Sequence, residues 1–323
     1  MAGEPGKHKL MRSLRTRRVW LCMLLVVTLC WMLLYIRHHR YIKTTDNTRA
    51  YPRKFVFPAC PPIGSTNVNL TETLKKTLEI GNGPPPGRDT LCSMSFEDLE
   101  MYHHTYFSTI QSPCKRSVRM GNTMDGGWDV CSDEIKKHAC LVYSFGIHFD
   151  FSFDDEMASV FGCEVHSFDP SMHQKDHVRN PSVFFHATGL SDYNGISNET
   201  VGWKMSTLKG IREELRHVSR APDVIKMDIE AFEWDVLPDM LRTSQLTDVK
   251  QLLVELHANY DSPLREYWVH KLLIFRDLYL EGYRVFWTGR NMQCTYKSPV
   301  HNRRLYGCYE VSFVKVNKSK SHK

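Results

Sequence analysis

The apolar positions of this chain follow two patterns, one near the N-terminus and one from about residue 95 onward. The first is an unbroken run at residues 19–36 (VWLCMLLVVTLCWMLLYI), eighteen residues without a charge, proline or glycine. At about 1.5 Å per helical residue this run covers roughly 27 Å, enough for a thin bilayer. The second pattern alternates short apolar runs with segments of helical periodicity, which is typical of a folded α/β domain.

Charges on either side of the apolar run indicate its orientation. Six Lys and Arg residues precede the run and three follow it closely, a bias that places the N-terminus in the cytoplasm. A cleaved signal peptide is the alternative, although its apolar region is usually only about 7–15 residues long. We therefore expect a single-pass type II membrane protein, or a secreted one if the segment is cleaved. The short span suits the endoplasmic reticulum or Golgi.

Sequons and cysteines agree with a lumenal environment beyond the run. Asn69, Asn198 and Asn317 each begin an Asn-x-Ser/Thr sequon, and no sequon precedes the run, so we expect a glycoprotein. Eight of the ten cysteines also lie beyond the run, and this even number predicts disulfide bonds. Their connectivity stays open, and Cys140 and Cys163 each begin an apolar run where a free thiol would also fit.

The remaining sequence divides into a tail, a stem and one large domain. We assign residues 1–18 to a cytoplasmic tail, 19–36 to the signal anchor, 37–94 to a polar, proline-punctuated stem, and 95–323 to the domain. Beyond residue 43 the chain carries 33 basic and 35 acidic side chains, so the overall basic excess belongs to the tail. No basic stripe suggests a nucleic-acid partner.

Strand and helix patterns alternate within the domain. Strands are predicted at residues 140–144, 164–168, 183–186, 223–227 and 249–256, and helices at 95–110, 152–161, 207–217, 233–242 and 264–280. Two further strands, at residues 283–287 and 309–316, close the chain. Such alternation implies right-handed crossovers and a mostly parallel sheet, with the last two strands as an antiparallel hairpin at one edge. This seven-strand order is that of the Rossmann-like, class I methyltransferase fold.

In such sheets ligands bind beyond the carboxyl ends of the strands. Gly146 follows the first strand, where it would let the backbone approach a ligand closely. Asp169 ends the second strand, spaced like an acid that accepts hydrogen bonds from a ribose diol. Asp192 follows the third strand and is a candidate to face an adenine amino group. These three residues are the predicted cofactor site.

Acids and a histidine follow the fourth and fifth strands. Asp228 and Glu230 stand at alternate positions after the fourth strand, so we expect them on one face, and His257 ends the fifth. Each has a purely structural alternative, because the carboxylates can pair with Lys226 or cap a helix and the imidazole can be buried. Their gathering at one rim of a sheet nevertheless favours a catalytic site.

Several motifs resemble the FkbM-like methyltransferases. They are VYSFGI at 142–147, SFDP at 167–170, GLSD at 189–192, IKMDIEAFE at 225–233 and LVELH at 253–257. The chain looks closest to the animal branch called methyltransferase-like proteins, with DGGWDVC at 125–131 as a further mark. The resemblance implies S-adenosylmethionine as the methyl donor and O-methylation as the reaction. It also implies that Gly146 and Asp169 hold the cofactor, with Asp228 and Glu230 beside the methyl group.

We therefore predict methyl transfer to a glycan or glycoprotein in the secretory pathway. A hydroxyl acceptor needs a base, for which Asp228 is the first candidate and His257 the second; no firm metal-ligand set is visible. A catalytically inactive binding protein is one alternative, because Ala231 replaces a glycine common in the family and Phe145 and Phe149 add bulk to the cofactor loop. A type II glycosyltransferase is another, but no Asp-x-Asp stands at a strand end.

Overall fold

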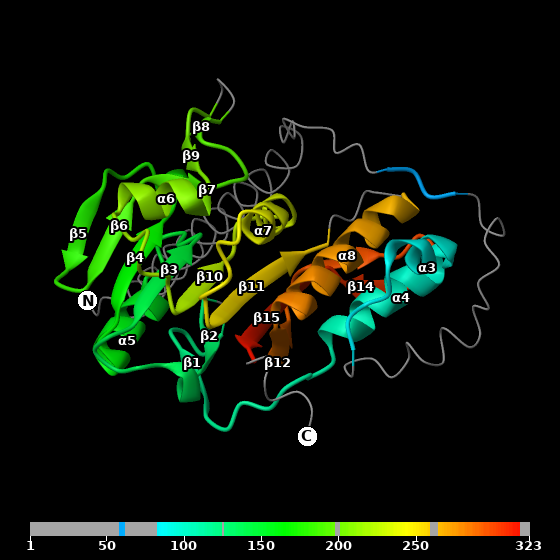
Figure 1. Ribbon diagram of the computed structural model, residues 1–323, viewed down its shortest axis with the longest axis horizontal. Helices are drawn as coiled ribbons and strands as arrows, with labels where there is room; N and C mark the ends of the chain where they lie inside the picture. The colour runs from blue at the N-terminus through cyan, green and yellow to red at the C-terminus, as the bar shows by residue number, and fades with distance from the viewer. Residues whose placement is uncertain (1–57, 62–82, 125, 198–200, 259–263, 317–323) are drawn as a thin grey trace, which may run out of the picture. The chain divides into compact units, whose positions relative to one another are not determined.

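A computed structural model describes residues 58–61, 83–124, 126–197, 201–258 and 264–316 (Figure 1). The predicted signal anchor and the three sequon asparagines lie outside these ranges. Among the helices within the ranges, none combines the length and the apolar composition that crossing a bilayer requires.

A mixed eight-stranded sheet runs through the domain (Figure 1). In spatial order its strands are β12 (Tyr283–Arg290), β15 (Cys308–Lys315), β11 (Gln251–His257), β10 (Val224–Met227), β3 (Leu141–Phe145), β4 (Glu164–Phe168), β6 (Val183–His186) and β5 (His177–Asn180). The five strands from β11 to β6 are parallel, whereas β15 runs antiparallel to both β11 and β12. The predicted parallel sheet with a C-terminal antiparallel hairpin is confirmed.

Short strands account for most of the differences from the predicted pattern. The eighth strand, β5, pairs antiparallel with β6, and a small hairpin of β13 (Thr295–Lys297) and β14 (Arg304–Tyr306) lies between β12 and β15 in sequence. Two small sheets contain β1 (Ser117–Met120) with β2 (Trp128–Cys131), and β7 (Thr188–Leu190) with β9 (Lys204–Ser206) and β8 (Gly195–Ile196). Several of these strands are largely exposed, so they lack the apolar alternation that reveals a strand in a sequence.

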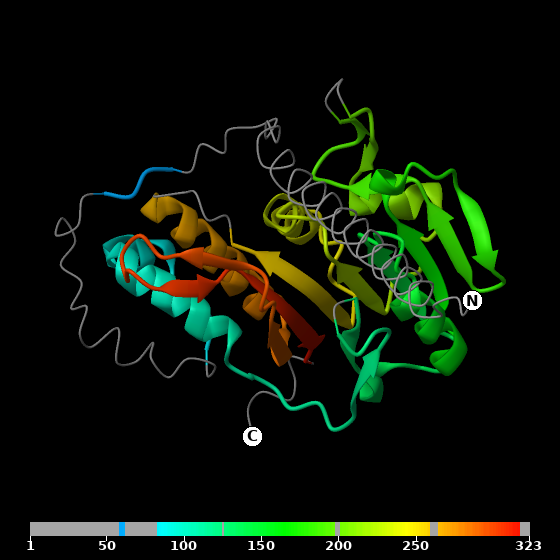
Figure 2. The same ribbon diagram turned by 180° about the vertical axis from the view of Figure 1, so that it is seen from behind.

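The predicted helices in the domain are confirmed. They are α4 (Phe96–Phe107), α5 (Ser152–Phe161), α6 (Leu208–Glu214), α7 (Glu233–Arg242) and α8 (Arg265–Glu281). The Ser95 side chain caps α4 by accepting a hydrogen bond from the Asp98 backbone N–H, and Thr207 caps α6 in the same way. A further helix, α3 (Arg88–Ser93), lies within the predicted stem and packs against α8. In Figure 1 α8 and α4 lie in front of β15. Figure 2 shows the same region from behind, with the C-terminal strands in front of these helices.

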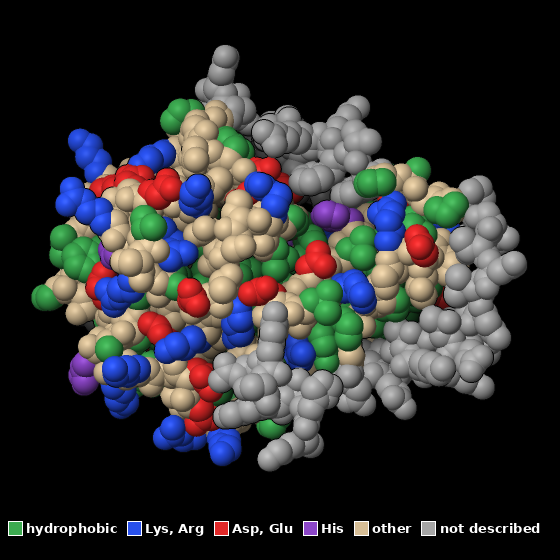
Figure 3. Space-filling model, in the orientation of Figure 1, with side chains coloured by type: hydrophobic (Ala, Val, Ile, Leu, Met, Phe, Trp, Pro, Cys, Tyr) green, Lys and Arg blue, Asp and Glu red, His purple; other side chains and the backbone are tan. Residues whose placement is uncertain are grey.

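Charged side chains are mixed over the visible surface. On the face drawn in Figure 3, acidic and basic groups are interspersed rather than gathered into a stripe of one sign.

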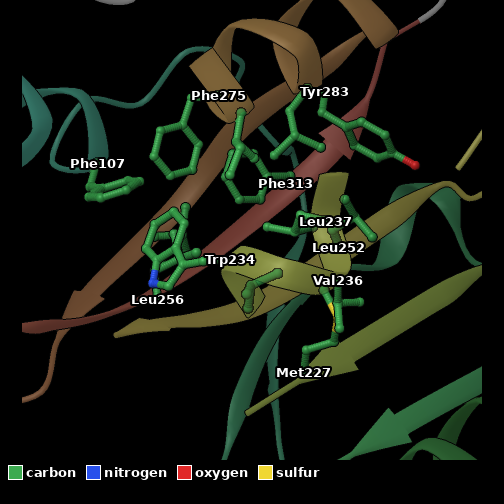
Figure 4. Packing of buried hydrophobic residues seen from close by; sticks show 14 of the residues in the cluster. Phe107, Met227, Trp234, Val236, Leu237, Leu252, Leu256, Phe275, Tyr283 and Phe313 are labelled. Carbon is green, nitrogen blue, oxygen red and sulfur yellow. The ribbon is translucent and has the colours of Figure 1, made fainter. Parts of the chain in front are cut away.

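The main hydrophobic core lies between the sheet and helices α4, α7 and α8. Phe107, Trp234, Phe275 and Phe313 meet there, and all four are at most 6 % exposed (Figure 4). Phe275 makes edge contacts with Phe107 and Trp234, with ring centroids 4.5 Å and 5.7 Å apart. Full burial of each such side chain stabilises the fold by roughly 1.5–3 kcal/mol. A smaller core under α5 covers the opposite face of the sheet.

All eight cysteines beyond the apolar run are paired. The disulfides join Cys60 to Cys92, Cys114 to Cys131, Cys140 to Cys163, and Cys294 to Cys308. Cys140 and Cys163, for which a free thiol was the alternative, are therefore bonded to each other just before β3 and β4. The pairing agrees with folding in an oxidising compartment.

Candidate functional site

Four strand ends meet at one rim of the sheet. In the pairing register, Phe145 of β3 lies beside Phe168 of β4 and Met227 of β10, so these three strands end level with one another. β11 continues beyond Val254, the partner of Met227, and carries His257 further out. The rim therefore brings together the segments that hold the predicted residues Gly146, Asp169, Asp228 and His257.

Gly146 follows β3 and packs directly against the backbone of Asp228, which follows β10. Its φ is +76°, and a Cβ on this residue would lie 1.7 Å from the Asp228 carbonyl oxygen. Lys226 adds a second link, because its ammonium donates to the Phe145 and Gly146 carbonyl oxygens at 3.1 Å and 2.5 Å. Glycine is therefore required here to pack the first loop against the fourth strand.

Asp169 organises the loop after β3. Its Oδ2 accepts from the backbone N–H groups of Ile147 and His148 at 2.9 Å and 2.8 Å. Its Oδ1 accepts from the backbone N–H and the hydroxyl of Ser171 at 2.8 Å and 2.6 Å. A carboxylate offers about four acceptor positions, and all of those on Asp169 are used by the protein itself. With a side chain only 5 % exposed, this residue fixes the loop that would cradle a cofactor.

Asp192 lies apart from this rim in the topology. It follows β7 of the small three-stranded sheet, and its carboxylate accepts a hydrogen bond from the Ser191 hydroxyl at 3.4 Å. The predicted third strand, β6, ends before it at His186.

Asp228 and His257 meet between β10 and β11. Asp228 Oδ1 lies 3.8 Å from His257 Nε2, and the two side chains are 32 % and 14 % exposed. The other ring nitrogen, Nδ1, lies 3.2 Å from Glu233 Oε1. The backbone carbonyl of His257 accepts from the Trp234 indole N–H. Contacts on both sides thus hold the imidazole with one nitrogen facing Asp228.

Glu233 is a further component of the site, outside the predicted set of residues. It is fully buried at the start of α7, where Oε1 also accepts from the Ile229 backbone N–H at 2.9 Å. Its Oε2 has no hydrogen-bond partner among the described residues. Its position at the end of the 225–233 motif could have indicated this role. An acid in the first turn of a helix that follows a strand points back toward the strand ends.

The electrostatics of this cluster are strongly perturbed. Burial by itself lowers the pKa of His257, but Glu233, Asp228 and Glu255 outweigh it and raise that pKa to about 10. Desolvation raises the pKa of Asp228, and Glu233 and Glu230 add to the effect. Burial, followed by the charge of Asp228, raises the pKa of Glu255 to about 8. At neutral pH these shifts leave His257 protonated and Glu255 a neutral carboxylic acid.

Glu230 does not share a face with Asp228 in the way that strand alternation predicts. β10 ends at Met227, so the two-residue period does not extend to Glu230, which is exposed. Glu230 and Ala231 have φ values of +59° and +76°, a conformation that favours glycine. This turn explains why a glycine suits the position of Ala231, and it places the two residues in a strained segment.

The residues at the rim fit S-adenosylmethionine in charge. The donor carries a positive sulfonium. Asp228 supplies negative charge beside His257, and so does Glu233 Oε2, which has no hydrogen-bond partner among the described residues. Close packing at Gly146 and the hydrogen bonds of Asp169 fix the position of the loop after β3. Because the acceptor positions of Asp169 are occupied, a ribose hydroxyl has to displace the Ser171 hydroxyl to bond with that carboxylate.

Comparison with known proteins gives a consistent assignment. A family model described as a methyltransferase domain matches residues 97–315. The rat and human proteins named "Probable methyltransferase-like protein 24" are each 25 % identical, over 248 and 235 residues. These matches cover 69 % and 65 % of this chain, and the chain spans 66 % and 62 % of the relatives' lengths.

Solved structures give weaker likenesses. The methyltransferase FkbM from Methylobacillus flagellatus is 14 % identical with a TM-score of 0.35, over 75 % of this chain and 59 % of that one. A 16S rRNA methyltransferase from Catenulisporales acidiphilia is 12 % identical with a TM-score of 0.30, over 62 % of this chain and 98 % of that one.

Proposed function

The chain belongs to the methyltransferase-domain family, and we propose that it transfers a methyl group from S-adenosylmethionine to an oxygen of a glycan or glycoprotein in the secretory pathway. The observation that carries this proposal is the 3.8 Å contact between Asp228 and His257 at the carboxyl ends of β10 and β11, where the surrounding carboxylates raise the pKa of His257. Strongly shifted pKa values at the strand ends of such a sheet are typical of a reaction centre.

Asp228 is the base in this proposal. S-adenosylmethionine, when bound, supplies a methyl group on a positively charged sulfur. As the acceptor hydroxyl takes up that methyl group, the Asp228 carboxylate would accept the hydroxyl proton. Desolvation raises the pKa of this carboxyl, which makes it a stronger base than an exposed aspartate.

His257 has a different task from the one that a free imidazole would have. With a pKa raised to about 10 by the surrounding carboxylates, it holds its proton at neutral pH and cannot accept another. Its imidazolium therefore orients Asp228, while Glu233 fixes the ring from the other side at 3.2 Å. Glu230 lies in the exposed turn beyond and serves in this proposal as a residue of the acceptor entrance.

Positioning supplies most of the rate in this reaction class, because an in-line displacement depends on alignment and exclusion of water. Gly146 and Asp169 provide that alignment by fixing the loop after β3, whose backbone lies against Asp228. Asp192 stands farther along the chain as the proposed contact for the adenine ring.

The cellular setting belongs to the same proposal. Four disulfides support an oxidising compartment, and the apolar run at residues 19–36 supports a type II anchor in the Golgi or endoplasmic reticulum. Endoglycosidase digestion of the full chain from cultured cells tests this, since glycans on Asn69, Asn198 or Asn317 require lumenal exposure. An unglycosylated chain that resists carbonate extraction would contradict the lumenal placement.

The decisive experiment separates binding from transfer. The full chain, purified in detergent, is assayed for S-adenosylmethionine binding by calorimetry and for transfer of labelled methyl groups to secretory-pathway glycoproteins. Asp228→Asn should keep donor affinity and lower transfer by about 10²–10⁴-fold, the usual contribution of a general base. Asp248→Asn is the matched control, because Asp248 is exposed and precedes β11, at the opposite end of that strand from His257; it should keep most of the transfer. Full activity of Asp228→Asn would remove it as the base.

A non-catalytic binding protein is the second candidate, favoured by the fully used acceptor positions of Asp169. The two candidates differ in one measurement. If neither the full wild-type chain nor its Ser171→Ala variant shows a heat of binding with S-adenosylmethionine, the donor does not bind at this site. The second candidate function is then supported.

A further inference from the structure

Away from the rim, three histidines gather beside Glu164. Glu164 and His166 belong to β4, His186 to β6, and His217 follows α6. Glu164 Oε1 lies 3.0 Å from His166 Nε2 and 3.5 Å from His217 Nε2. One ligand atom from each of Glu164, His166 and His217 lies within 4.8 Å of the other two.

Each of the three side chains is held by a partner on its outer side. His166 Nδ1 is 2.9 Å from His186 Nε2, and His217 Nδ1 is 2.7 Å from the Tyr143 hydroxyl. The Arg220 guanidinium donates to the outer oxygen of the glutamate at 2.6 Å. These contacts leave one nitrogen of each imidazole and one carboxylate oxygen facing a common centre. Metal-binding side chains are oriented in this way by a second layer of hydrogen bonds.

A hydrogen-bonded pair of rings orients His166. His166 Nδ1 contacts His186 Nε2 at 2.9 Å, and the two rings stack with centroids 5.2 Å apart. When the ring proton of His166 lies on Nδ1 and donates to His186, its Nε2 carries a lone pair that faces Glu164 and can bind a cation. His166 is only 7 % exposed, so this nitrogen is largely shielded from bulk water.

We propose that Glu164, His166 and His217 bind a zinc ion. The cation takes the place of the proton between Glu164 and His166, so the ring proton of His166 lies on Nδ1 and donates to His186 Nε2. Two imidazole nitrogens and a carboxylate oxygen are ordinary zinc ligands.

The distances suit a tetrahedral ion. Zinc bonds of about 2.0–2.2 Å separate two ligand atoms by roughly 3.3–3.5 Å, and the observed separations from Glu164 Oε1 are 3.0 Å and 3.5 Å. Glu164 and His217 retain exposed fractions of 34 % and 15 %, so water can take the fourth position. The ion would join the start of β4 to the segment after α6, independently of methyl transfer.

Metal analysis of the full chain tests this site. The protein is purified in detergent without a metal-affinity step, stripped with a chelator, and titrated with zinc against a chromogenic competitor. The wild type should bind about one zinc per chain at this site, and cobalt substitution should give the absorption bands of a tetrahedral ion. His217→Gln should weaken zinc binding at least tenfold, as expected when a ligand is lost.

Control variants make the outcome specific. His177→Gln changes an exposed histidine on β5 and should bind zinc like the wild type. Tyr143→Phe removes only the outer partner of His217 and should weaken binding by about tenfold, so a test remains if His217→Gln fails to fold. Asp228, Glu233 and His257 also bring ligand atoms within 4.8 Å. Failure of stripped wild type to take up zinc, or loss of the ion in His257→Gln but not in His217→Gln or Tyr143→Phe, would overturn the proposal.

Discussion

The β3–β4 half and the β10–β11 half of the rim differ in how completely their buried carboxylates are hydrogen-bonded. On the side of β3 and β4, Asp169 has every acceptor position used by neighbouring backbone and hydroxyl groups. On the side of β10 and β11, Glu233 Oε2 is buried and has no partner within the described part of the chain. Asp228, Glu255 and His257 lie around it with raised pKa values. The β3–β4 half therefore has its carboxylate fully paired, whereas the β10–β11 half keeps one buried carboxylate oxygen without a partner among the described residues.

This difference distinguishes the residues that build the site from those that could react. Buried polar groups in proteins are normally paired, and an unpaired one costs about 1–3 kcal/mol. The unpaired oxygen is therefore a local cost in stability, and its combination with strongly shifted pKa values is typical of reaction centres. The β3–β4 half therefore sets the position of the loop, and the β10–β11 half supplies the reactive charges.

The largest expected effect comes from removing Glu233. Glu233→Ala leaves the His257 imidazolium without its closest carboxylate and should lower the free energy of unfolding by about 3–5 kcal/mol. Urea unfolding followed by circular dichroism measures it. The control is Asp155→Ala, which breaks an exposed ion pair with Arg179 and should cost under about 1 kcal/mol. Equal losses in the two variants would show that the rim cluster has no special energetic role.

The pH dependence of stability tests the same cluster. The pKa of His257 is raised from 6.5 to about 10, so its contribution is fully present below about pH 6.5 and is lost as pH rises toward 10. The free energy of unfolding should fall over this window by on the order of 5 kcal/mol. Glu255, with its pKa raised to about 8, adds a decline that begins near pH 4.5. Thermal melts at stepped pH should show less decline in His257→Gln.

His104 provides the opposite case for comparison. It is buried between the hydroxyls of Tyr296 and Tyr309, each 2.9 Å away, and burial lowers its pKa to about 4. Its contribution is therefore present above about pH 6.5 and is lost as pH falls toward 4. His104→Gln should flatten the acid side of the stability curve and leave the alkaline side unchanged. A loss of the alkaline slope in this variant would contradict the assignment to His257.

The fold could be predicted from the sequence because its main elements are long or deeply buried. Helices α5 and α7 and strands β4 and β6 have the predicted bounds, since apolar runs and periodicity mark them clearly. Strand β5, with three exposed residues in four, has no such pattern. Disulfide partners could not be read either, because connectivity depends on which strand starts lie side by side.

The site could be predicted only as a set of strand ends. Topology alone brings Gly146, Asp169, Asp228 and His257 to one rim, and that much follows from counting strands. Whether a carboxylate is saturated or short of partners depends on hydrogen bonds made across the loops, which no spacing reveals. The roles of Glu233 and of the Ser171 hydroxyl therefore emerge only from the three-dimensional structure.

A smaller effect is expected from freeing one acceptor position on Asp169. Ser171→Ala removes the hydroxyl that donates to Oδ1 at 2.6 Å and should cost about 1 kcal/mol of stability. The vacated position can then accept a ribose hydroxyl, so S-adenosylmethionine affinity should be kept or increased several-fold in calorimetry. Asp169→Ala is the matched opposite and should abolish binding. Weaker binding in Ser171→Ala would mean that the hydroxyl itself assists the donor.

The smallest effect should come from the turn between β10 and α7. Ala231→Gly relieves a left-handed backbone, worth about 1–2 kcal/mol, but loses a largely buried methyl group, worth about 0.8 kcal/mol, and adds freedom to the unfolded chain. The net gain should stay below about 1 kcal/mol, which raises Tm by roughly 2 °C in calorimetry. Gly146→Ala at φ +76° should do the reverse and strongly lower Tm, because its Cβ would meet the Asp228 carbonyl at 1.7 Å. A fall in Tm for Ala231→Gly would mean that packing of the methyl group stabilises the fold by more than the backbone strain destabilises it. The turn would then not lower the stability of the β10–β11 half.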